Sequence, residues 1–267
     1  MIRSFLLAPL LLVCGAATFG FAASAEQPWP HATAVLDTAT KDLKSSGIRG
    51  LAKDVPDLED ALAHGIATEV VVPTDESHGI VLADGLAEVL VATAAASKSG
   101  KEVSVIATPY PLIALFLGSY YNEIGKPGDA LRVLNIGIDL SDTQSLGLGE
   151  HDPELVSEKG AALEALKRLD DALAVYKFGL KLSANSDNDQ ARMFRGIGYS
   201  LTELGRLDEA EAAYKKSLQC EPGNGHAENE LRYIAQLRAG KGASPTVLQT
   251  ALPPPDKAAP KGACPKE

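Results

Sequence analysis

The chain has 267 residues, of which 45% are hydrophobic and 22% are charged, and its formal net charge at pH 7 is −10. Three cysteines in a chain of this length do not make a disulfide scaffold. An acidic chain without runs of Lys and Arg has no basic footprint for a phosphate backbone, so we exclude nucleic acid as a partner.

The N-terminus predicts export. An uncharged apolar stretch, residues 4–25, follows Arg3 and ends in Ala23, Ser24 and Ala25. Small residues at the end of such a stretch are the pattern that a signal peptidase cuts. We therefore expect a signal peptide over residues 1–25, cleavage after Ala25, and a periplasmic or secreted protein.

Two alternatives to cleavage stay open. An uncleaved stretch of about 20 apolar residues is long enough to anchor the chain in the inner membrane. Cys14 loosely resembles the cysteine of a bacterial lipobox, which would make the protein a lipoprotein. No later segment predicts a membrane span, because Asp84 and Glu88 interrupt the apolar run Ile80–Ala96 at a spacing typical of a core-facing helix.

Residues 26–110 predict an irregular, mostly helical region without repeats. Helical patterns cover His31–Lys44 and Pro56–His64. The β-branched runs Glu69–Pro73 and Glu102–Ile106 are strand-like and could pair as a small ribbon, with a helix over Asp84–Ser97 between them. We expect this region to cap the domain that follows it.

Three segments of the C-terminal half align at the same positions. Counted from Gly118, Gly160 or Gly198, a small alanine lies at +12, a large residue at +16 and a small residue at +19. Two antiparallel helices in close contact need small residues where their backbones approach and large residues where the gap opens. The third segment is the most complete and reads Gly198, Leu201, Leu204, Gly205, Ala210, Tyr214, Ser217 and Pro222.

This order of glycine, alanine, aromatic residue and proline resembles the tetratricopeptide repeat (TPR) family, in an exported protein of bacterial type. The resemblance covers roughly residues 111–224 and implies an all-α fold, a short α-solenoid of three TPR-like helical hairpins. The first segment departs from the family pattern, with Leu134 for the aromatic residue and Asp142 for the proline. Successive glycines lie 42 and 38 residues apart, against about 34 in the family, so we expect longer loops around Thr143–Glu150 and Ser183–Asp189.

Local signals agree with a third hairpin. Leu204-Gly205 places a glycine just past the end of the first helix, and Asp208 with Glu211 is typical of a capping box that opens the second helix.

The array is expected to end in a capping helix and a tail. The helix His226–Arg238 carries Leu231, Ile234 and Leu237 on one face and completes an array over residues 111–238. Residues 239–267 hold six prolines among Lys, Ala and Gly and predict a disordered tail.

Signal cleavage would leave two cysteines in a compartment that permits a disulfide. Cys220 lies near the end of a second repeat helix, where the family has an apolar residue, and Cys264 lies in the tail. We expect a buried thiol at Cys220 and a free Cys264, with an intramolecular bridge as the less favoured alternative.

The sequence holds no constellation of catalytic or metal-binding residues. The five histidines lack a metal-ligand spacing, and no nucleophile elbow, phosphate loop or dinucleotide fingerprint occurs. We therefore expect no enzyme activity, no metal and no cofactor.

The candidate binding site is one face of the first helix of the third repeat. Phe194, Ile197 and Leu201 recur at helical spacing and predict the buried stripe. In TPR proteins another face of the first helices lines a concave groove. The resemblance places six residues there: Arg192, Arg195, Tyr199, Thr202, Asn229 and Tyr233.

Two guanidinium groups beside an aromatic ring suit a carboxylate or an extended acidic segment. Leu115 and Ser157 occupy positions where the family's dicarboxylate clamp has lysine, so a generic peptide groove is expected instead. The alternative for both arginines is pairing with acidic neighbours such as Glu158 or Glu230.

The sequence thus predicts an exported TPR scaffold that binds a protein or peptide partner through the concave face of its repeats. Two other functions stay open. One is a structural component of an envelope assembly, in secretion, pilus or outer-membrane machinery, which would share the fold. The other is a small enzyme with its site in residues 26–110.

Overall fold

The computed structural model of the protein describes residues 29–67, 78–82, 102–106, 108–144, 152–183, 186–240 and 264–265. The predicted signal peptide, the predicted strand Glu69–Pro73 and the predicted helix Asp84–Ser97 lie outside these residues. So does most of the predicted tail, of which residues 239–240 and 264–265 are described.

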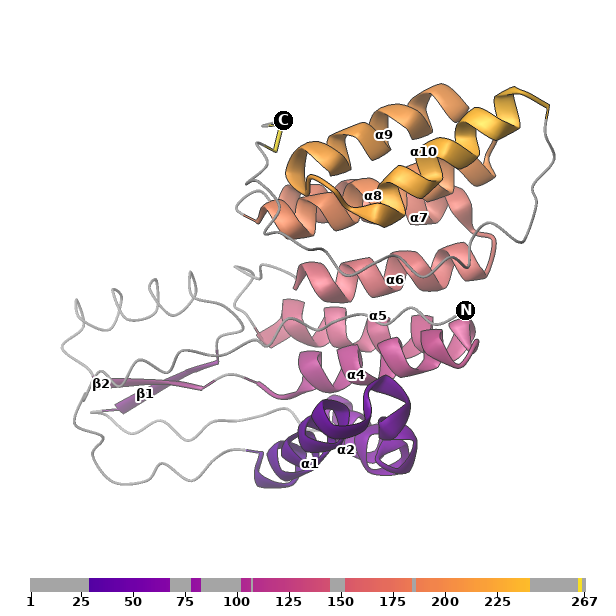
Figure 1. The fold of residues 1–267 in the computed structure, drawn as a ribbon. Coiled ribbons are helices and arrows are strands. Elements are labelled where there is room, and N and C mark those ends of the chain that lie inside the picture. The colour runs from indigo at the N-terminus through magenta and orange to yellow at the C-terminus, as the bar shows by residue number, and fades with distance from the viewer. Residues whose placement is uncertain are drawn as a thin grey trace.

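Six helices form three hairpins that stack in chain order into an α-solenoid, as Figure 1 shows. The two helices of each hairpin contact each other, and each second helix also contacts the first helix that follows it. A single helix, α10, packs against the last hairpin. The bounds are α4 Tyr110–Glu123, α5 Pro127–Gln144, α6 Pro153–Ala165, α7 Leu169–Leu182, α8 Asp187–Glu203, α9 Leu207–Cys220 and α10 Gly225–Arg238.

The residue sixteen positions after each repeat glycine fills the space that the glycine leaves. A Cβ added at Gly198 would lie 2.8 Å from the ring of Tyr214, so any side chain there would push α8 and α9 apart. Ala210, at +12, is fully buried. The same contact recurs in the pairs Gly118–Leu134, Gly160–Tyr176 and Gly198–Tyr214. The predicted register is therefore confirmed in all three hairpins.

Each hairpin turns at the seventh residue after its repeat glycine. This residue has a left-handed backbone in all three hairpins, with φ of 73° at Gly125, 59° at Lys167 and 74° at Gly205. Glycine adopts this conformation without a steric cost, which confirms the glycine predicted just past the end of α8. Lys167 makes the same turn with a side chain, and its Nζ donates to Glu203 Oε2 at 2.8 Å.

The start of α9 differs from the predicted capping box. The N-cap is Arg206, whose side chain makes no capping hydrogen bond and instead donates to Glu209 at 2.8 and 2.6 Å. Asp208 and Glu211 lie inside the helix and pair with Arg238 of α10. The predicted capping box is therefore wrong. The ion pair between Arg206 and Glu209 lies at the start of α9 instead, and the two residues predicted to form the box bind Arg238 of α10.

Part of the extra length of the long repeats lies in helices. α5 reaches Gln144, and α8 begins at Asp187, inside a region that we expected to be loop. α8 therefore has 17 residues where α6 has 13. Residues 145–151 and 184–185 lie outside the described part of the chain.

The capping helix α10 covers the end of the array as predicted. Ile234 is fully buried, and Leu231 packs against the core of the third hairpin. The helix begins at a side-chain cap, because Asn224 Oδ1 accepts a hydrogen bond from the amide of Ala227 at 3.1 Å.

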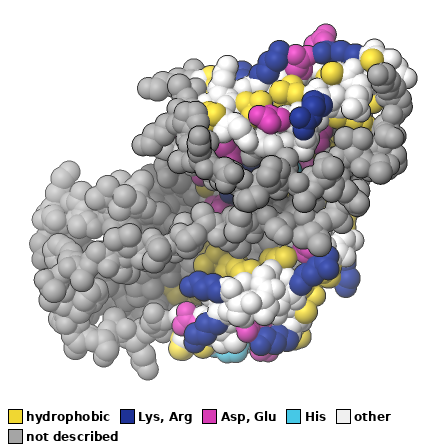
Figure 2. Space-filling model, viewed as in Figure 1, with side chains coloured by type: hydrophobic (Ala, Val, Ile, Leu, Met, Phe, Trp, Pro, Cys, Tyr) yellow, Lys and Arg dark blue, Asp and Glu magenta, His cyan; other side chains and the backbone are white. Residues whose placement is uncertain are grey.

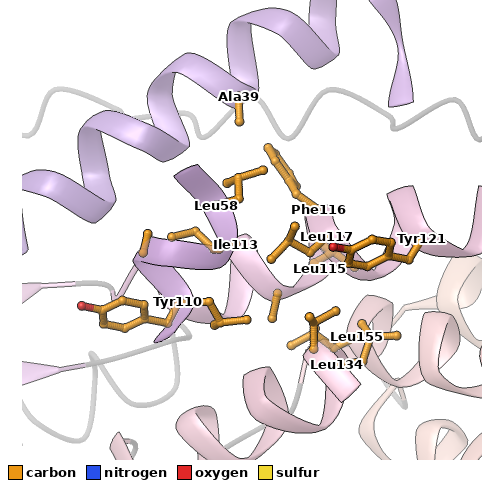
Figure 3. Packing of buried hydrophobic residues seen from close by; sticks show 14 of the residues in the cluster. Ala39, Leu58, Tyr110, Ile113, Leu115, Phe116, Leu117, Tyr121, Leu134 and Leu155 are labelled. Carbon is orange, nitrogen blue, oxygen red and sulfur yellow. The ribbon is translucent and has the colours of Figure 1, made fainter. Parts of the chain in front are cut away.

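The N-terminal helices pack on the first hairpin. α1 (Pro30–Ser46) and α2 (Val55–Ala67) were both predicted, and the 3₁₀ helix η1 (Ile48–Lys53) joins them. All three contact α4. Figure 3 shows Phe116 of α4 pointing toward Ala39 of α1 and Leu58 of α2.

A small parallel sheet lies between the N-terminal helices and the array in the chain. β1 (His78–Leu82) pairs with β2 (Glu102–Ile106), with His78 opposite Glu102. β2 is the predicted strand, but its partner comes from residues 78–82, which include the start of the apolar run that we expected to be helical. The helical prediction for Ile80–Leu82 is therefore wrong, because a short run of apolar, partly β-branched residues fits a strand as well as a helix.

Two buried clusters meet within α6. The first joins α1, α2, α4 and α5 and includes Leu155 and Ala162 of α6. The second begins at Leu163 of α6 and continues through α7, α8, α9 and α10. In Figure 3, Leu134 of α5 and Leu155 of α6 lie on the opposite side of α4 from Ala39 and Leu58. Within the described ranges, no helix combines the length and the apolar character that a membrane span needs.

Cys220 and Cys264 form a disulfide, so the prediction of a free Cys264 is wrong. Cys220 ends α9 and is buried, and Cys264 packs against the second cluster. The two cysteines are 44 residues apart, and the tail has no periodic pattern that would place it beside α9. The bridge is therefore a long-range contact that periodicity cannot predict.

Candidate partner-binding face

The first helices lie next to one another and form one face of the array, here called the inner face. α4 contacts α6, α6 contacts α8, and α8 contacts α10. Equivalent positions therefore fall in rows across the array. Six residues before the repeat glycine lie Glu154 of α6 and Arg192 of α8, and three residues before it lie Ser157 and Arg195.

Arg192 joins the second and third hairpins. Both of its terminal nitrogens donate to Glu154 Oε1, at 3.4 and 3.5 Å, and Nη2 lies 3.9 Å from Asp189 Oδ1. The side chain keeps 22% of its surface exposed. These long bonds hold the guanidinium loosely, because partly exposed ion pairs contribute little.

Arg195 lies one turn further along α8. Its Nη1 donates to Glu221 Oε2 at 2.6 Å, and its side chain is 23% exposed. Both predicted cations thus pair with acidic neighbours, although with Glu154, Asp189 and Glu221 rather than with Glu158 or Glu230. A guanidinium carries five N–H donors, and among the described residues Arg195 uses one of them on Glu221, which leaves donors for a ligand oxygen.

Two tyrosines continue the inner face. Tyr199 of α8 and Tyr233 of α10 occupy equivalent positions and are both half-buried, as is the equivalent Ala161 of α6. Asn229 is also half-buried, and its side-chain oxygen accepts a hydrogen bond from Arg232. Arg195, Tyr199 and Tyr233 thus lie half-buried on the contacting helices α8 and α10, and their joint role in binding stays a prediction.

Thr202 does not belong to this face. It is 8% exposed, and its Oγ1 donates to the carbonyl of Gly198 at 2.8 Å. A threonine inside a helix commonly bonds the carbonyl four residues back, which turns its hydroxyl away from solvent. The prediction of Thr202 as a groove residue is therefore wrong.

Other polar contacts between the first helices escaped the sequence analysis. Ser200 of α8 donates to Glu164 of α6 at 3.0 Å, and both residues are buried. Asn122 of α4 donates to the side chain and the carbonyl of Glu158 at 2.8 and 3.0 Å. Of these contacts between first helices, the sequence could have predicted the pair of Glu154 and Arg192. Their opposite charges lie six residues before their repeat glycines.

Asp152 lies at one edge of the inner face. It is the N-cap of α6, and its Oδ1 accepts a hydrogen bond from the amide of Glu154 at 2.8 Å. Burial raises the pKa of Asp152 to about 6, and the carboxylates of Glu154 and Asp189 add to the rise, whereas the amide bond and Arg192 oppose it. This carboxyl therefore titrates closer to neutrality than an ordinary aspartate.

The described residues do not meet the requirements of a metal site. Among them, no group of three or more His, Cys, Asp or Glu side chains is arranged to hold a metal ion. The arrangement places hydrogen-bond donors and aromatic rings on the same face of the array.

Comparison with known proteins gives similarity to solved structures only. No protein-family model and no curated protein matches the chain. The chain is similar to the NMR structure of the first TPR domain of the human RPAP3 protein, at 26% identity over 49% of this chain and 94% of that chain, with a TM-score of 0.43. It is also similar to the first TPR of Spaghetti (RPAP3) bound to the HSP90 peptide SRMEEVD, at 26% identity over 49% and 94% of the two chains, with a TM-score of 0.41.

The repeat geometry of the chain itself supports a TPR-like fold. Each of three hairpins has the glycine packed under a large residue sixteen positions later, and each has a left-handed turn residue at +7. The first helices contact one another, and a single helix closes the end. The chain is a tetratricopeptide-like helical repeat protein.

Proposed function

We propose that the protein is an exported scaffold that binds an extended peptide or protein segment on its inner face. The observation that supports this most directly is the set of Arg195, Tyr199 and Tyr233. These half-buried side chains lie on neighbouring first helices and belong to neither buried cluster. Each keeps part of its surface exposed, so a ligand on the inner face can contact it.

The chemistry of this face fits a general peptide groove. Tyrosine rings can cover apolar side chains of the bound segment. The remaining guanidinium donors can bind its backbone carbonyls or a carboxylate. Because Arg192 and Arg195 already pair with Glu154 and Glu221, the face is not a dedicated anion receptor. The proposed partner is therefore recognised by shape and backbone, with one or a few carboxylates.

Export is the part of the proposal that rests on residues 1–25. The proposed mature N-terminus is Glu26, and the proposed location is the periplasm or the medium, with an inner-membrane anchor or a lipidated Cys14 as the alternatives. Intact mass measurement of the protein from its native envelope separates these outcomes, because each leaves a different N-terminal mass.

The test removes the two central side chains of the inner face. We expect Arg195→Ala with Tyr199→Ala to abolish partner capture from envelope extract, with a melting temperature close to that of the wild type, because both side chains are only half-buried. The matched control is Phe178→Ala on α7, a second helix, where the side chain is 43% exposed. Wild-type capture by the double variant would reject the inner face as the site.

The same experiment separates a structural role in an envelope assembly from peptide binding. A structural component of an envelope assembly would keep its neighbours in the double variant, because permanent interfaces do not depend on a groove. An enzyme in residues 26–110 would need a cleft. The described part of that region has a shallow recess of about 190 Å³, lined by Ala34, Val35, Thr38, Asp54 and Asp57. Thr38 donates its hydroxyl to the carbonyl of Ala34 rather than to a base.

A further inference from the structure

A recess of about 190 Å³ lies between α1 and the junction of η1 with α2. α1 contributes Ala34, Val35 and Thr38 to its lining, and the junction contributes Asp54 and Asp57. The hydroxyl of Thr38 donates to the carbonyl of Ala34, so it donates to neither carboxylate. The lining is therefore mostly aliphatic on α1 and acidic at the start of α2.

Asp54 is the buried acid of this recess. The residue is only 7% exposed, and its Oδ2 is buried without a hydrogen-bond partner among the described residues. Asp54 stands directly before α2, where an aspartate commonly caps the helix, but no amide of the described chain reaches this oxygen. A buried carboxylate oxygen without a partner costs free energy, so helix capping alone does not account for Asp54.

The lysine beside Asp54 is already bound. Lys53 Nζ lies 3.0 Å from Asp42 Oδ1. Asp57 is exposed and makes no ion pair with a described residue. Burial of Asp54, together with the charge of Asp42, raises the pKa of Asp54, and Lys53 opposes this rise. The recess therefore holds negative charge that its own cation does not balance.

The surface around the recess is acidic on balance. Residues 29–67 carry six acidic and four basic side chains, a net charge of −2. Figure 2 shows side chains of both charges over the lower part of the molecule, where α1 and α2 lie in Figure 1. Two of the basic side chains are paired, Lys53 with Asp42 and Arg49 with Glu123 at 3.0 Å. The local field thus favours the approach of a cation.

The shape and chemistry of the recess fit an ammonium group on an aliphatic stem. An ammonium has three donors, which can serve the carboxylates of Asp54 and Asp57, while its methylene groups lie against Ala34 and Val35. A guanidinium binds best to a carboxylate that presents both oxygens in parallel, whereas one oxygen of Asp54 is buried. A hard metal ion needs several oxygen ligands, and the described residues hold no such group of three.

We propose that this recess binds the primary ammonium group of an alkylamine, with Asp54 and Asp57 as the carboxylates that hold it. A lysine side chain of another protein and a free diamine share this group. The inference is independent of the proposed function, because the recess lies on the N-terminal helices and shares no residue with the inner face.

The test is a titration of the isotope-labelled full chain, followed by NMR of its backbone amides. The probes are cadaverine and Nα-acetyl-lysine methylamide, which carry the same ammonium on stems of similar length. We expect saturable shifts at the amides of Thr38 and Asp57, and no such shifts with the neutral n-pentanol. Binding of both probes identifies a lysine side chain as a ligand, and binding of cadaverine alone identifies a small diamine.

Two variants test the role of the buried carboxylate. Asp54→Asn keeps the size of the side chain and removes its charge, so we expect about fivefold weaker binding or more. The matched control is Asp37→Asn on α1, which removes an exposed carboxylate outside the recess and should leave the affinity unchanged. Should Asp54→Asn fail to fold, Asp57→Asn at the exposed position gives a second reading with the same expected direction.

Four outcomes would overturn the inference. They are no saturable shift with either amine, equal shifts with n-pentanol, tighter binding of calcium chloride than of the amines, and equal losses of affinity in Asp37→Asn and Asp54→Asn. The second outcome would make the recess a purely apolar site, the third a metal site, and the fourth would show an effect of net charge alone. Since the inner face takes no part in this titration, each of them leaves the proposed function standing.

Discussion

Ala210 lies where the two helices of the third hairpin approach each other. It is fully buried, and Leu at this position must separate α8 from α9. We expect Ala210→Leu to destabilise the protein by about 1–3 kcal/mol, the range typical of overpacked cores. Ala212 is exposed on the same helix, so Ala212→Leu is the matched control. Equal urea midpoints for the two variants would show that the helix register is wrong.

Asp152 gives the inner face a dependence on pH. Its folded pKa of about 6 lies above the ordinary value of 3.8, so its contribution to stability is greatest at low pH and is lost as the pH rises through the interval between these values. Asparagine caps a helix equally well and does not titrate. We expect Asp152→Asn to melt above the wild type at pH 7, by a margin that narrows toward pH 4.5. A margin that is constant with pH would contradict the raised pKa.

The turn of the second hairpin differs from the other two in its residue at +7. Lys167 holds a left-handed backbone where Gly125 and Gly205 stand in the other hairpins. Lys167→Gly and Lys167→Ala both lose the ion pair with Glu203, so their difference reports the backbone strain set against the chain entropy of glycine. We expect the glycine variant to be more stable by about 1 kcal/mol in urea unfolding. The opposite order would mean that the loss of chain entropy outweighs the strain.

The hairpins could be predicted from sequence because their constraints are local. Gly198, Ala210 and Tyr214 recur at fixed offsets, and each controls a contact inside one hairpin. The burial of Thr202 could not be predicted, because its hydroxyl can bond either water or the carbonyl of Gly198 and the residue type does not say which. The pairing of β1 with β2 and the disulfide to Cys264 join segments far apart in the sequence. Sequence periodicity describes local structure and therefore cannot predict such contacts.

At the scale of the molecule, Glu59 links the N-terminal helices to the array. Its Oε1 accepts hydrogen bonds from Tyr121 at 2.8 Å and from Arg132 at 2.6 Å, and burial together with the bond to Glu59 raises the pKa of Tyr121. We expect a double-mutant cycle of Glu59→Ala and Tyr121→Phe to give a coupling of about 1 kcal/mol in unfolding free energy. The neighbouring Tyr120→Phe should give no coupling with Glu59→Ala, and equal values for both tyrosines would exclude a specific link.

The disulfide also decides how the molecule carries mechanical load. A pull on residues 265–267 passes through the bond from Cys264 to Cys220 and enters α9 directly. The chain from Glu221 to Ala263, which includes α10, forms a covalent ring that lies outside this path. Tension on the C-terminus therefore reaches the third hairpin before it can peel away the capping helix, and the array is loaded within its last hairpin rather than at its end.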